Sequence, residues 1–241
     1  MTTALFTLSD THLSLTTHKP MDVFGSRWRD HAEKLRSGWN RVVSPEDTVI
    51  VGGDVSWGIS TEEAKEDLLF LDSLNGQKIL LRGNHDYWWT TPKKVTDFFA
   101  AQGISTMKLL QNNYHVAEGV VICGTRGWYS DSANAPEESD YQKIVAREVQ
   151  RLKLSLDSVP EEHKDKEILV FTHFPPKFEN YVCRPLIELM KEYSVRRCYF
   201  GHIHGVYAIA PVTLFEGIEF HIVSADYLNF IPLAISTKET T

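Results

Sequence analysis

Short apolar runs rich in β-favouring residues recur along this 241-residue chain, and segments with helical periodicity separate them. Most of the runs end in a glycine or a polar residue. Strands that alternate with helices in this way predict an α/β layered domain. The runs are Leu5–Leu8, Thr48–Val51, Lys78–Leu81, Val120–Cys123, Ile168–Phe171 and Cys198–Phe200. Because the sequence shows no repeat, low-complexity tract or linker, we predict a single domain over residues 1–241.

The segments between these runs carry signals for helix ends. Ser60 and Glu63 form a capping-box pattern at the start of a helix over 60–74. Thr91 as N-cap and Pro92 as first residue begin another helix, which ends at Gly103. Further helices are predicted over 27–42, 137–156 and 184–192. After residue 205 the pattern contains only strands, near 206–210, 218–223 and 230–235.

Composition excludes several classes of protein. The chain has 25 basic and 32 acidic side chains, so its net charge is −7 with histidine neutral. It lacks the broad basic surface that binds a nucleic-acid backbone, and long duplex nucleic acid is not expected as a partner. The hydrophobic fraction of 42% excludes a disordered chain. Three cysteines without a CxxC pair, no signal-peptide pattern and no apolar stretch of about 18 residues predict a cytoplasmic protein without membrane contact.

Polar motifs rich in histidine follow five of the predicted strands, at the point where each strand ends. In open α/β sheets, sites are built in the crevice beyond the carboxyl ends of the strands. The motifs can therefore converge although they are spread over residues 10–204. They are Asp10-Thr11-His12, Gly52-Gly53-Asp54, Arg82-Gly83-Asn84-His85-Asp86, Thr172-His173 and Gly201-His202-Ile203-His204.

The residue types in these motifs suit a pair of metal ions. Imidazole together with carboxylate and amide oxygen favours first-row ions such as Mn, Fe or Zn. One intervening residue puts Asp10 and His12 on the same face of an extended strand end, and the same holds for His202 and His204. A carboxylate such as Asp54 can bridge two cations about 3.5–4 Å apart, which activate a water and orient a phosphate.

Glycine directly precedes three of the candidate ligands, at Gly53, Gly83 and Gly201. Glycine lets the backbone turn tightly where a Cβ would clash. Most of the motifs are weak signals alone, because a Gly-Gly-Asp is usually a turn and a single strand-end histidine is usually structural. Gly-Asn-His-Asp is a stronger signal, because a turn rarely needs three consecutive polar side chains of this kind. The ordered set of five, all at strand ends, is the informative feature.

In this order, Asp-x-His, Gly-Asp, Gly-Asn-His-Asp, a later single histidine and Gly-His-x-His resemble the signature of the calcineurin-like metallophosphoesterases. The resemblance covers residues 10–204. It implies a four-layer α/β/β/α sandwich of the metallo-dependent phosphatase type, with two divalent or trivalent metal ions. It also implies hydrolysis of a phosphate ester by a metal-activated bridging water. Matched motif by motif, it implies one metal held by Asp10, His12 and His204, the other held by Asn84, His173 and His202, Asp54 as the bridging ligand, and His85 beside the phosphate as general acid.

Three subfamilies fit less well. Eukaryotic-type Ser/Thr protein phosphatases resemble Gly-Asp-x-x-Asp-Arg-Gly at the second motif, where this chain has Trp57 in place of the second carboxylate. This difference argues against protein phosphatase activity and leaves open which group orients His85. Asp86 either orients it or only fixes the loop. The lipid A pathway pyrophosphatases carry Arg in place of His85, and DNA-repair exonucleases of this fold are larger.

Aromatic residues and one arginine are candidates for substrate binding. Arg126 either grips a phosphate oxygen in bidentate fashion or forms a salt bridge. Several aromatic side chains form either a rim that stacks on the organic group of a substrate or packing between loops and sheet. They are Trp57, Tyr87, Trp88, Trp89, Trp128 and Tyr129, with Trp88 as the substrate-binding candidate. The stretch 129–140 is long for a connection and is a candidate lid. His18, His31, His115, His163 and His221 fit no motif and are expected to be structural.

The leading hypothesis is a hydrolase of a small phosphomonoester or phosphodiester. One alternative is a catalytically silent scaffold of this fold that binds proteins, but such proteins lose ligand positions and this chain keeps all of them. Another is a nuclease that acts on short nucleic acid. The natural substrate, the metals and the oligomeric state stay open.

Overall fold

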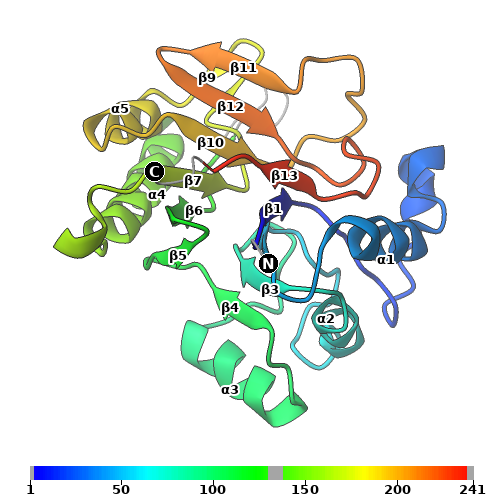
Figure 1. Cartoon of the computed structure of the whole chain (residues 1–241). Helices are drawn as coiled ribbons and strands as arrows, with labels where there is room; N and C mark the ends of the chain where they lie inside the picture. The colour runs from blue at the N-terminus through cyan, green and yellow to red at the C-terminus, as the bar shows by residue number, and fades with distance from the viewer. Residues whose placement is uncertain (1–2, 130–137, 238–241) are drawn as a thin grey trace.

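Two β-sheets packed against each other form the centre of the structure, a computed structural model that describes residues 3–129 and 138–237 (Figure 1). The first sheet contains, in spatial order, β13 (Leu233–Ile235), β1 (Leu5–Leu8), β2 (Thr48–Val51), β3 (Gln77–Leu80) and β4 (Met107–Leu109). The second contains β11 (Val212–Phe215), β12 (Ile218–Ile222), β10 (Arg197–Phe200), β7 (Ile168–Thr172), β6 (Val120–Thr125) and β5 (His115–Ala117). A short hairpin pairs β8 (Lys177–Phe178) with β9 (Tyr181–Val182).

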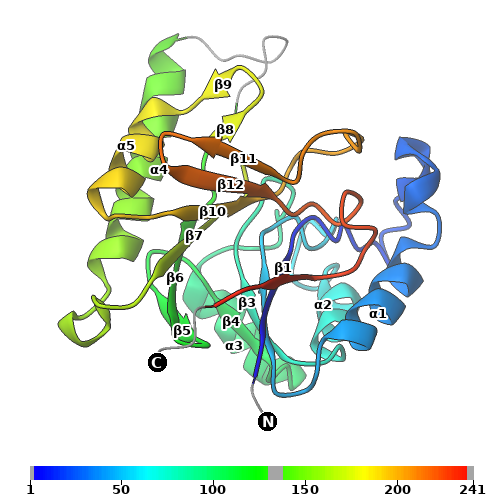
Figure 2. The same cartoon turned by 45° about the horizontal axis from the view of Figure 1, so that its top comes forward.

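Helices cover the outer face of each sheet (Figures 1 and 2). On the first sheet lie α1 (His31–Val42), α2 (Lys65–Asp72) and α3 (Pro92–Gln102). On the second lie α4 (Glu138–Asp157) and α5 (Arg184–Glu192). The short 3-10 helices are η1 (Met21–Phe24), η2 (Ser26–Trp28) and η3 (Glu161–His163). In the described part of the chain, no helix combines the length and the apolar character needed to cross a bilayer.

The hydrophobic core divides into three clusters, one at each interface between layers. On β2, Val49 and Val51 join α1, α2 and α3 in one cluster, whereas Ile50 between them faces the second sheet. On β7, Leu169 faces the first sheet and Val170 faces α4 and α5. This alternation is the period-two pattern of strands covered on both faces. The predicted four-layer α/β/β/α sandwich is confirmed.

Most predicted elements are confirmed with small shifts of their ends. The helix α3 has Thr91 as N-cap, whose side chain accepts from the Lys94 N–H, and Gly103 as a left-handed C-cap. The helix predicted from residue 60 begins only at Lys65, because Ser60 and Glu63 cap the turn before it. The strand predicted near 206–210 is wrong, since the strand lies at Val212–Phe215. The strands β4 and β5 were not predicted, because three residues are too few to show a period.

The two sheets are joined directly beside the first motif. The backbone N–H of Ser9 donates to the Val223 carbonyl at 2.8 Å, and the Ala225 N–H donates to the Ser9 carbonyl at 2.8 Å. Ser9 follows β1 of the first sheet, whereas Val223 and Ala225 follow β12 of the second. Because β1, β2, β3 and β4 are mutually parallel, and so are β6, β7, β10 and β12, the carboxyl ends of strands from both sheets lie at this edge.

Candidate metal centre

The structure brings the five motifs together where the two sheets meet. Asp10 follows β1, Asp54 follows β2, and Asn84 follows β3. His173 follows β7, and the His202 segment follows β10. The shared direction of these strands therefore explains why ligands from distant parts of the sequence converge.

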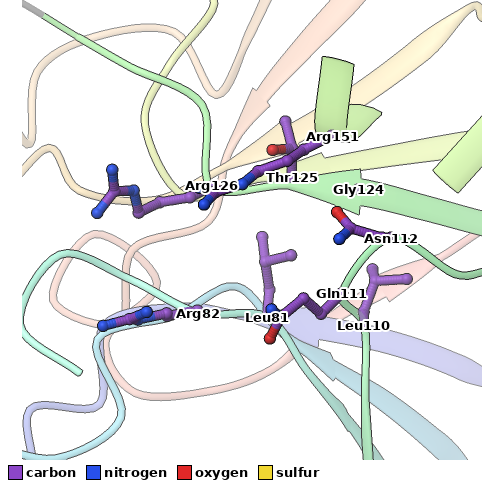
Figure 3. A pocket seen from close by; sticks show the side chains of 9 residues that line it. All are labelled: Leu81, Arg82, Leu110, Gln111, Asn112, Gly124, Thr125, Arg126 and Arg151. Atoms are coloured by element: carbon purple, nitrogen blue, oxygen red, sulfur yellow. The ribbon is translucent and has the colours of Figure 1, made fainter. Parts of the chain in front are cut away.

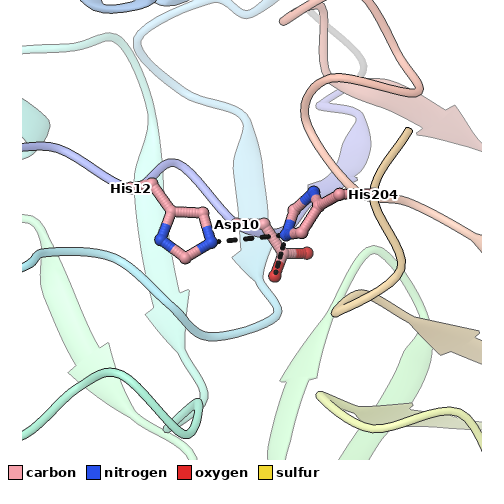
Figure 4. Close-up of side chains that lie close together, drawn as sticks. All are labelled: Asp10, His12 and His204. Carbon is pink, nitrogen blue, oxygen red and sulfur yellow. Dashed lines mark hydrogen bonds and ion pairs between the residues drawn. The ribbon is translucent and has the colours of Figure 1, made fainter. Parts of the chain in front are cut away.

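One group of donors consists of Asp10, His12 and His204, whose ligand atoms lie within 4.8 Å of one another (Figure 4). Nε2 of His12 is 3.3 Å from Nε2 of His204. Nε2 of His204 is 3.6 Å from Oδ1 of Asp10. Asp10 and His12 are buried and His204 is partly exposed, so this group is open on one side.

A second group consists of Asp10, Asp54 and His173, all buried. Nε2 of His173 is 2.7 Å from Oδ1 of Asn84 and 3.4 Å from Oδ2 of Asp54. The ring of His202 packs against that of His173, with centroids 5.3 Å apart. Oδ2 of Asp54 is also 3.7 Å from Nε2 of His12, so this carboxylate lies between the two groups.

The backbone is strained at this cluster. Asp10, His12, Asp54 and His202 all have positive φ angles, between 43° and 69°. The left-handed region is uncommon for residues other than glycine, and such residues gather at functional sites. Sequence patterns carry no sign of these conformations.

Two glycines are required because carboxylates lie against them. A Cβ at Gly83 would stand 2.1 Å from Oδ1 of Asp54, and one at Gly201 would stand 2.2 Å from Oδ2 of Asp10. The predicted clash of a Cβ is confirmed at Gly83 and Gly201, which provide room for the carboxylates. Of the three glycines, the one with a positive φ is Gly53, at 101°.

Each group also has a partner that fixes a histidine ring from outside. Nδ1 of His204 donates to Asp226 at 2.8 Å, and Nδ1 of His173 donates to the Gly52 carbonyl at 3.2 Å. Such outer hydrogen bonds turn Nε2 toward a metal. Asp226 was missed by sequence reasoning. It lies in a polar segment shortly after β12, and that position at the end of a further parallel strand is the available signal.

Asp86 fixes a loop and does not orient His85. Its carboxylate accepts from the backbone N–H groups of Asp54, Val55 and Gly83 at 2.8–2.9 Å. It therefore holds the second and third motifs against each other. The alternative left open by the sequence is resolved in favour of loop fixation.

His85 lies at the mouth of the cluster and packs against Trp57. The two ring centroids are 4.3 Å apart, and the His85 backbone N–H donates to Asp54 Oδ1 at 2.7 Å. Burial and then the nearby charge of Lys19 lower the pKa of His85. The side chain that packs against the His85 ring is thus aromatic rather than a carboxylate.

The electrostatics favour a cation in the cluster. Burial raises the pKa of Asp54 well above its usual range, and the charges of Asp86 and Asp10 raise it further. Burial lowers the pKa of His204, but hydrogen bonds to Asp10 and Asp226 raise it to about 10. The carboxylates therefore repel one another and attract positive charge at the ring.

The donor set fits metal ions for a second reason. Because Nδ1 of His173 donates to Gly52, the neutral ring presents a lone pair at Nε2 toward two further acceptors, Asn84 Oδ1 and Asp54 Oδ2. A cation bound among these three atoms would satisfy them together. Imidazole, carboxylate and amide oxygen are ligands of first-row ions.

Comparison with known proteins agrees with this chemistry. The family model described as calcineurin-like phosphoesterase matches residues 5–206. The chain belongs to the calcineurin-like phosphoesterases. It is accordingly a metal-dependent enzyme that hydrolyses phosphate esters. A search of curated protein sequences finds no match.

Two solved structures resemble this phosphoesterase over nearly its whole length. The phosphopantetheinyl hydrolase of Mycobacterium tuberculosis has a TM-score of 0.59 at 15% identity, with 99% of this chain and 97% of that chain covered. The protein TT1561 of Thermus thermophilus has a TM-score of 0.55 at 8% identity, with 99% and 100% covered. At these identities the likeness shows the fold alone.

The prediction that Trp88 binds substrate in this phosphoesterase is wrong. Trp88 and Trp89 are buried, with 0% and 1% of their surface exposed. Nε1 of Trp88 donates to Asp86 at 2.9 Å, and Nε1 of Trp89 donates to Gln111 at 2.8 Å. Both rings pack the third motif onto the first sheet and offer no face to a ligand.

Arg126 remains beside the metal centre. Its backbone carbonyl accepts from the N–H groups of His173 and Phe174, which follow β7. Its guanidinium group is 3.7 Å from Glu148, and 23% of its side chain is exposed. Arg126 and Arg82 flank a small cavity of about 50 Å³, and their side chains extend in the same direction, away from Asn112 (Figure 3). In the described part of the phosphoesterase, Nε of both arginines is buried without a hydrogen-bond partner.

Two sequence predictions concern residues away from the cluster. Most of the candidate lid over 129–140 lies outside the described residues. Among the described residues, neither donor group includes a histidine outside the motifs. His31 supports the centre indirectly, since its Nε2 is 3.1 Å from the His12 carbonyl oxygen.

Proposed function

We propose that this phosphoesterase holds two metal ions, of Mn, Fe or Zn, and hydrolyses a small phosphomonoester or phosphodiester. The observation that carries the proposal is the position of Asp54 between two donor groups, 3.7 Å from His12 and 3.4 Å from His173. A carboxylate between two sets of ligands is the arrangement that bridges a metal pair. The proposed ligands are Asp10, His12 and His204 for one ion, Asn84, His173 and His202 for the other, and Asp54 for both.

The protein's own residues then position and protonate the substrate. When bound, the ions polarise the phosphate and lower the pKa of a coordinated water. His85 faces the mouth of the cluster, where an anionic phosphate favours its protonated form. A protonated imidazole at that position can act as general acid toward the leaving oxygen. Arg126, beside His173, is proposed to contact a phosphate oxygen.

We further propose a cytoplasmic setting and a substrate other than long duplex nucleic acid. The three cysteines are buried free thiols, as expected in a reducing compartment. The net charge of −7 supports substrate capture by the metal ions rather than by a broad basic surface.

The test combines metal analysis with activity. The purified protein is loaded with Mn, Fe or Zn in turn, and hydrolysis of p-nitrophenyl phosphate, its bis ester and a cyclic nucleotide is measured. We expect two metal equivalents per chain and at least a tenfold loss of turnover in His85→Ala with metal content unchanged. His163→Ala, outside the motifs, is the control. A single metal equivalent per chain would contradict the proposed metal pair. No hydrolysis with any metal would contradict the proposed reaction and favour the scaffold alternative.

A further inference from the structure

A cavity of about 140 Å³ opens at the metal centre and is lined by two kinds of side chain. Imidazole and carboxylate groups line it, from His12, Asp54, His85, His202 and His204. Four apolar side chains line it as well, Met21, Phe24, Trp28 and Trp57. Three of these four belong to η1 and η2, the segment between the first motif and α1. A phosphate held at the metal centre would therefore have an apolar wall next to it.

Three of the four apolar side chains pack against other residues of the protein, Met21, Trp28 and Trp57. Trp28 is 1% exposed and meets the rings of His12 and His204 edge-on. Met21 is 5% exposed, and its sulfur accepts from Nε1 of Trp57 at 3.0 Å. The Trp57 ring stacks on His12 with centroids 4.9 Å apart, and the Lys19 ammonium lies 3.3 Å from its centroid. Trp28 and Trp57 support the metal ligands, and Trp28 and Met21 have little surface left for a substrate.

Phe24 is different, because it lines the cavity and is 58% exposed. It ends η1, and Gly25 follows with a φ of 129°, a conformation that side chains rarely adopt. The Gly25 N–H donates to the Asp22 carbonyl at 3.1 Å and closes the turn. The local backbone thus holds a large apolar ring at the mouth of a hydrolytic site.

We propose that Phe24 is a specificity residue and that the phosphoesterase prefers phosphate esters whose organic group is a compact aromatic or branched apolar group. This inference rests on the proposed function. The cavity of about 140 Å³ includes the space at the proposed metal ligands, so beside a bound phosphate it leaves room only for a compact organic group. Since the phosphate would lie against the histidines of the metal centre, the organic group would lie toward Phe24, the exposed apolar side chain of the lining.

The test measures binding with phosphonates, which keep the charged group and are not hydrolysed. Calorimetry on the metal-loaded protein compares inorganic phosphate, methylphosphonate and phenylphosphonate. We expect phenylphosphonate to bind at least tenfold more tightly than methylphosphonate. Phe24→Ser should reduce this ratio to threefold or less and leave the affinity for inorganic phosphate unchanged, whereas Phe24→Leu should keep most of it.

Val23→Ser is the matched control, because Val23 is 70% exposed on the same turn and does not line the cavity. If inorganic phosphate fails to bind, the proposed function itself fails. If phosphate binds and the two phosphonates bind equally well, the proposed function stands and the preference for an apolar group is overturned. If the ratio survives Phe24→Ser, the assignment of Phe24 is overturned.

Discussion

The two donor groups of the metal centre have different surroundings. We call the group of Asp10, His12 and His204 the His12 side, and the group around His173 the His173 side. On the His12 side, Trp28 and Trp57 pack against the ligand rings, and a carboxylate, Asp226, holds His204. On the His173 side, a backbone carbonyl holds the ring and Arg126 lies nearby. The motifs look equivalent in sequence, but aromatic side chains surround one group of histidines, whereas Arg126 lies beside the other.

The largest effect is expected where the two sides share a residue. Asp54→Asn removes a charge that faces both His12 and His173, so we expect loss of both metal ions and at least a thousandfold loss of turnover. Metal content and hydrolysis are measured together. Asp97→Asn, an exposed carboxylate on α3 paired with Lys93, serves as control and should change neither. Full metal content in Asp54→Asn would show that the two sides do not depend on it.

A smaller effect should separate the two sides. Asp226→Asn weakens the partner of His204 alone, and loss of an outer hydrogen bond typically lowers metal affinity by about 10–100-fold. We expect the variant to lose one ion at a lower chelator concentration than the unsubstituted protein does, while it keeps the other ion. Titration with a chelator and metal analysis at each step checks this. Simultaneous loss of both ions would mean that the sides are not independent.

The pH dependence of stability after chelation tests the same contact. Hydrogen bonds to Asp10 and Asp226 overcome burial and raise the pKa of His204 to about 10, above its unfolded value of 6.5. The stabilisation is therefore complete below about pH 6.5 and is lost as the pH rises through about 10. Urea unfolding of chelated protein at pH 6, 8 and 10 should show this fall. Asp226→Asn should flatten it, and an equally steep fall in the variant would contradict the assignment.

On the other side, Arg126→Met should raise KM by about tenfold and change turnover less, because a lost bidentate contact to phosphate mainly weakens binding. Arg151→Met is the matched control. Arg151 pairs with the same Glu148, at 2.6 Å, but lies on α4. Steady-state kinetics of both variants separates a contact with substrate from a structural ion pair. Equal behaviour of the two variants would remove Arg126 from the site.

The smallest effect on catalysis is expected at Trp88. Trp88→Phe removes its hydrogen bond to Asp86, which should cost about 2 kcal/mol of unfolding free energy. KM should stay within a factor of two, because the ring is buried. Urea unfolding and kinetics measure the two quantities on one sample. A large rise in KM without loss of stability would restore Trp88 as a substrate contact.

The sequence predicts the layers and the ligand candidates well because both depend on local order along the chain. Strand ends are marked by the switch from apolar runs to glycine and polar residues, as at Val51 to Asp54. Asp226 could not be found in this way, since its role depends on contact with His204 across the fold. Trp88 was misassigned because an aromatic residue beside a motif has the same pattern whether it faces solvent or the sheet.

The link between Ser9 and the segment after β12 has a consequence for how the molecule reaches its working state. The two bonds close a chain loop of more than two hundred residues, and closure over such a length is slow and comes late. Asp10 follows this link directly, and its contacts with His202 and His204 form only when those residues reach the same site. A chain synthesised only as far as β4 has the early ligands without their partners, so catalytic competence arises only after β10 and the residues that follow it are in position.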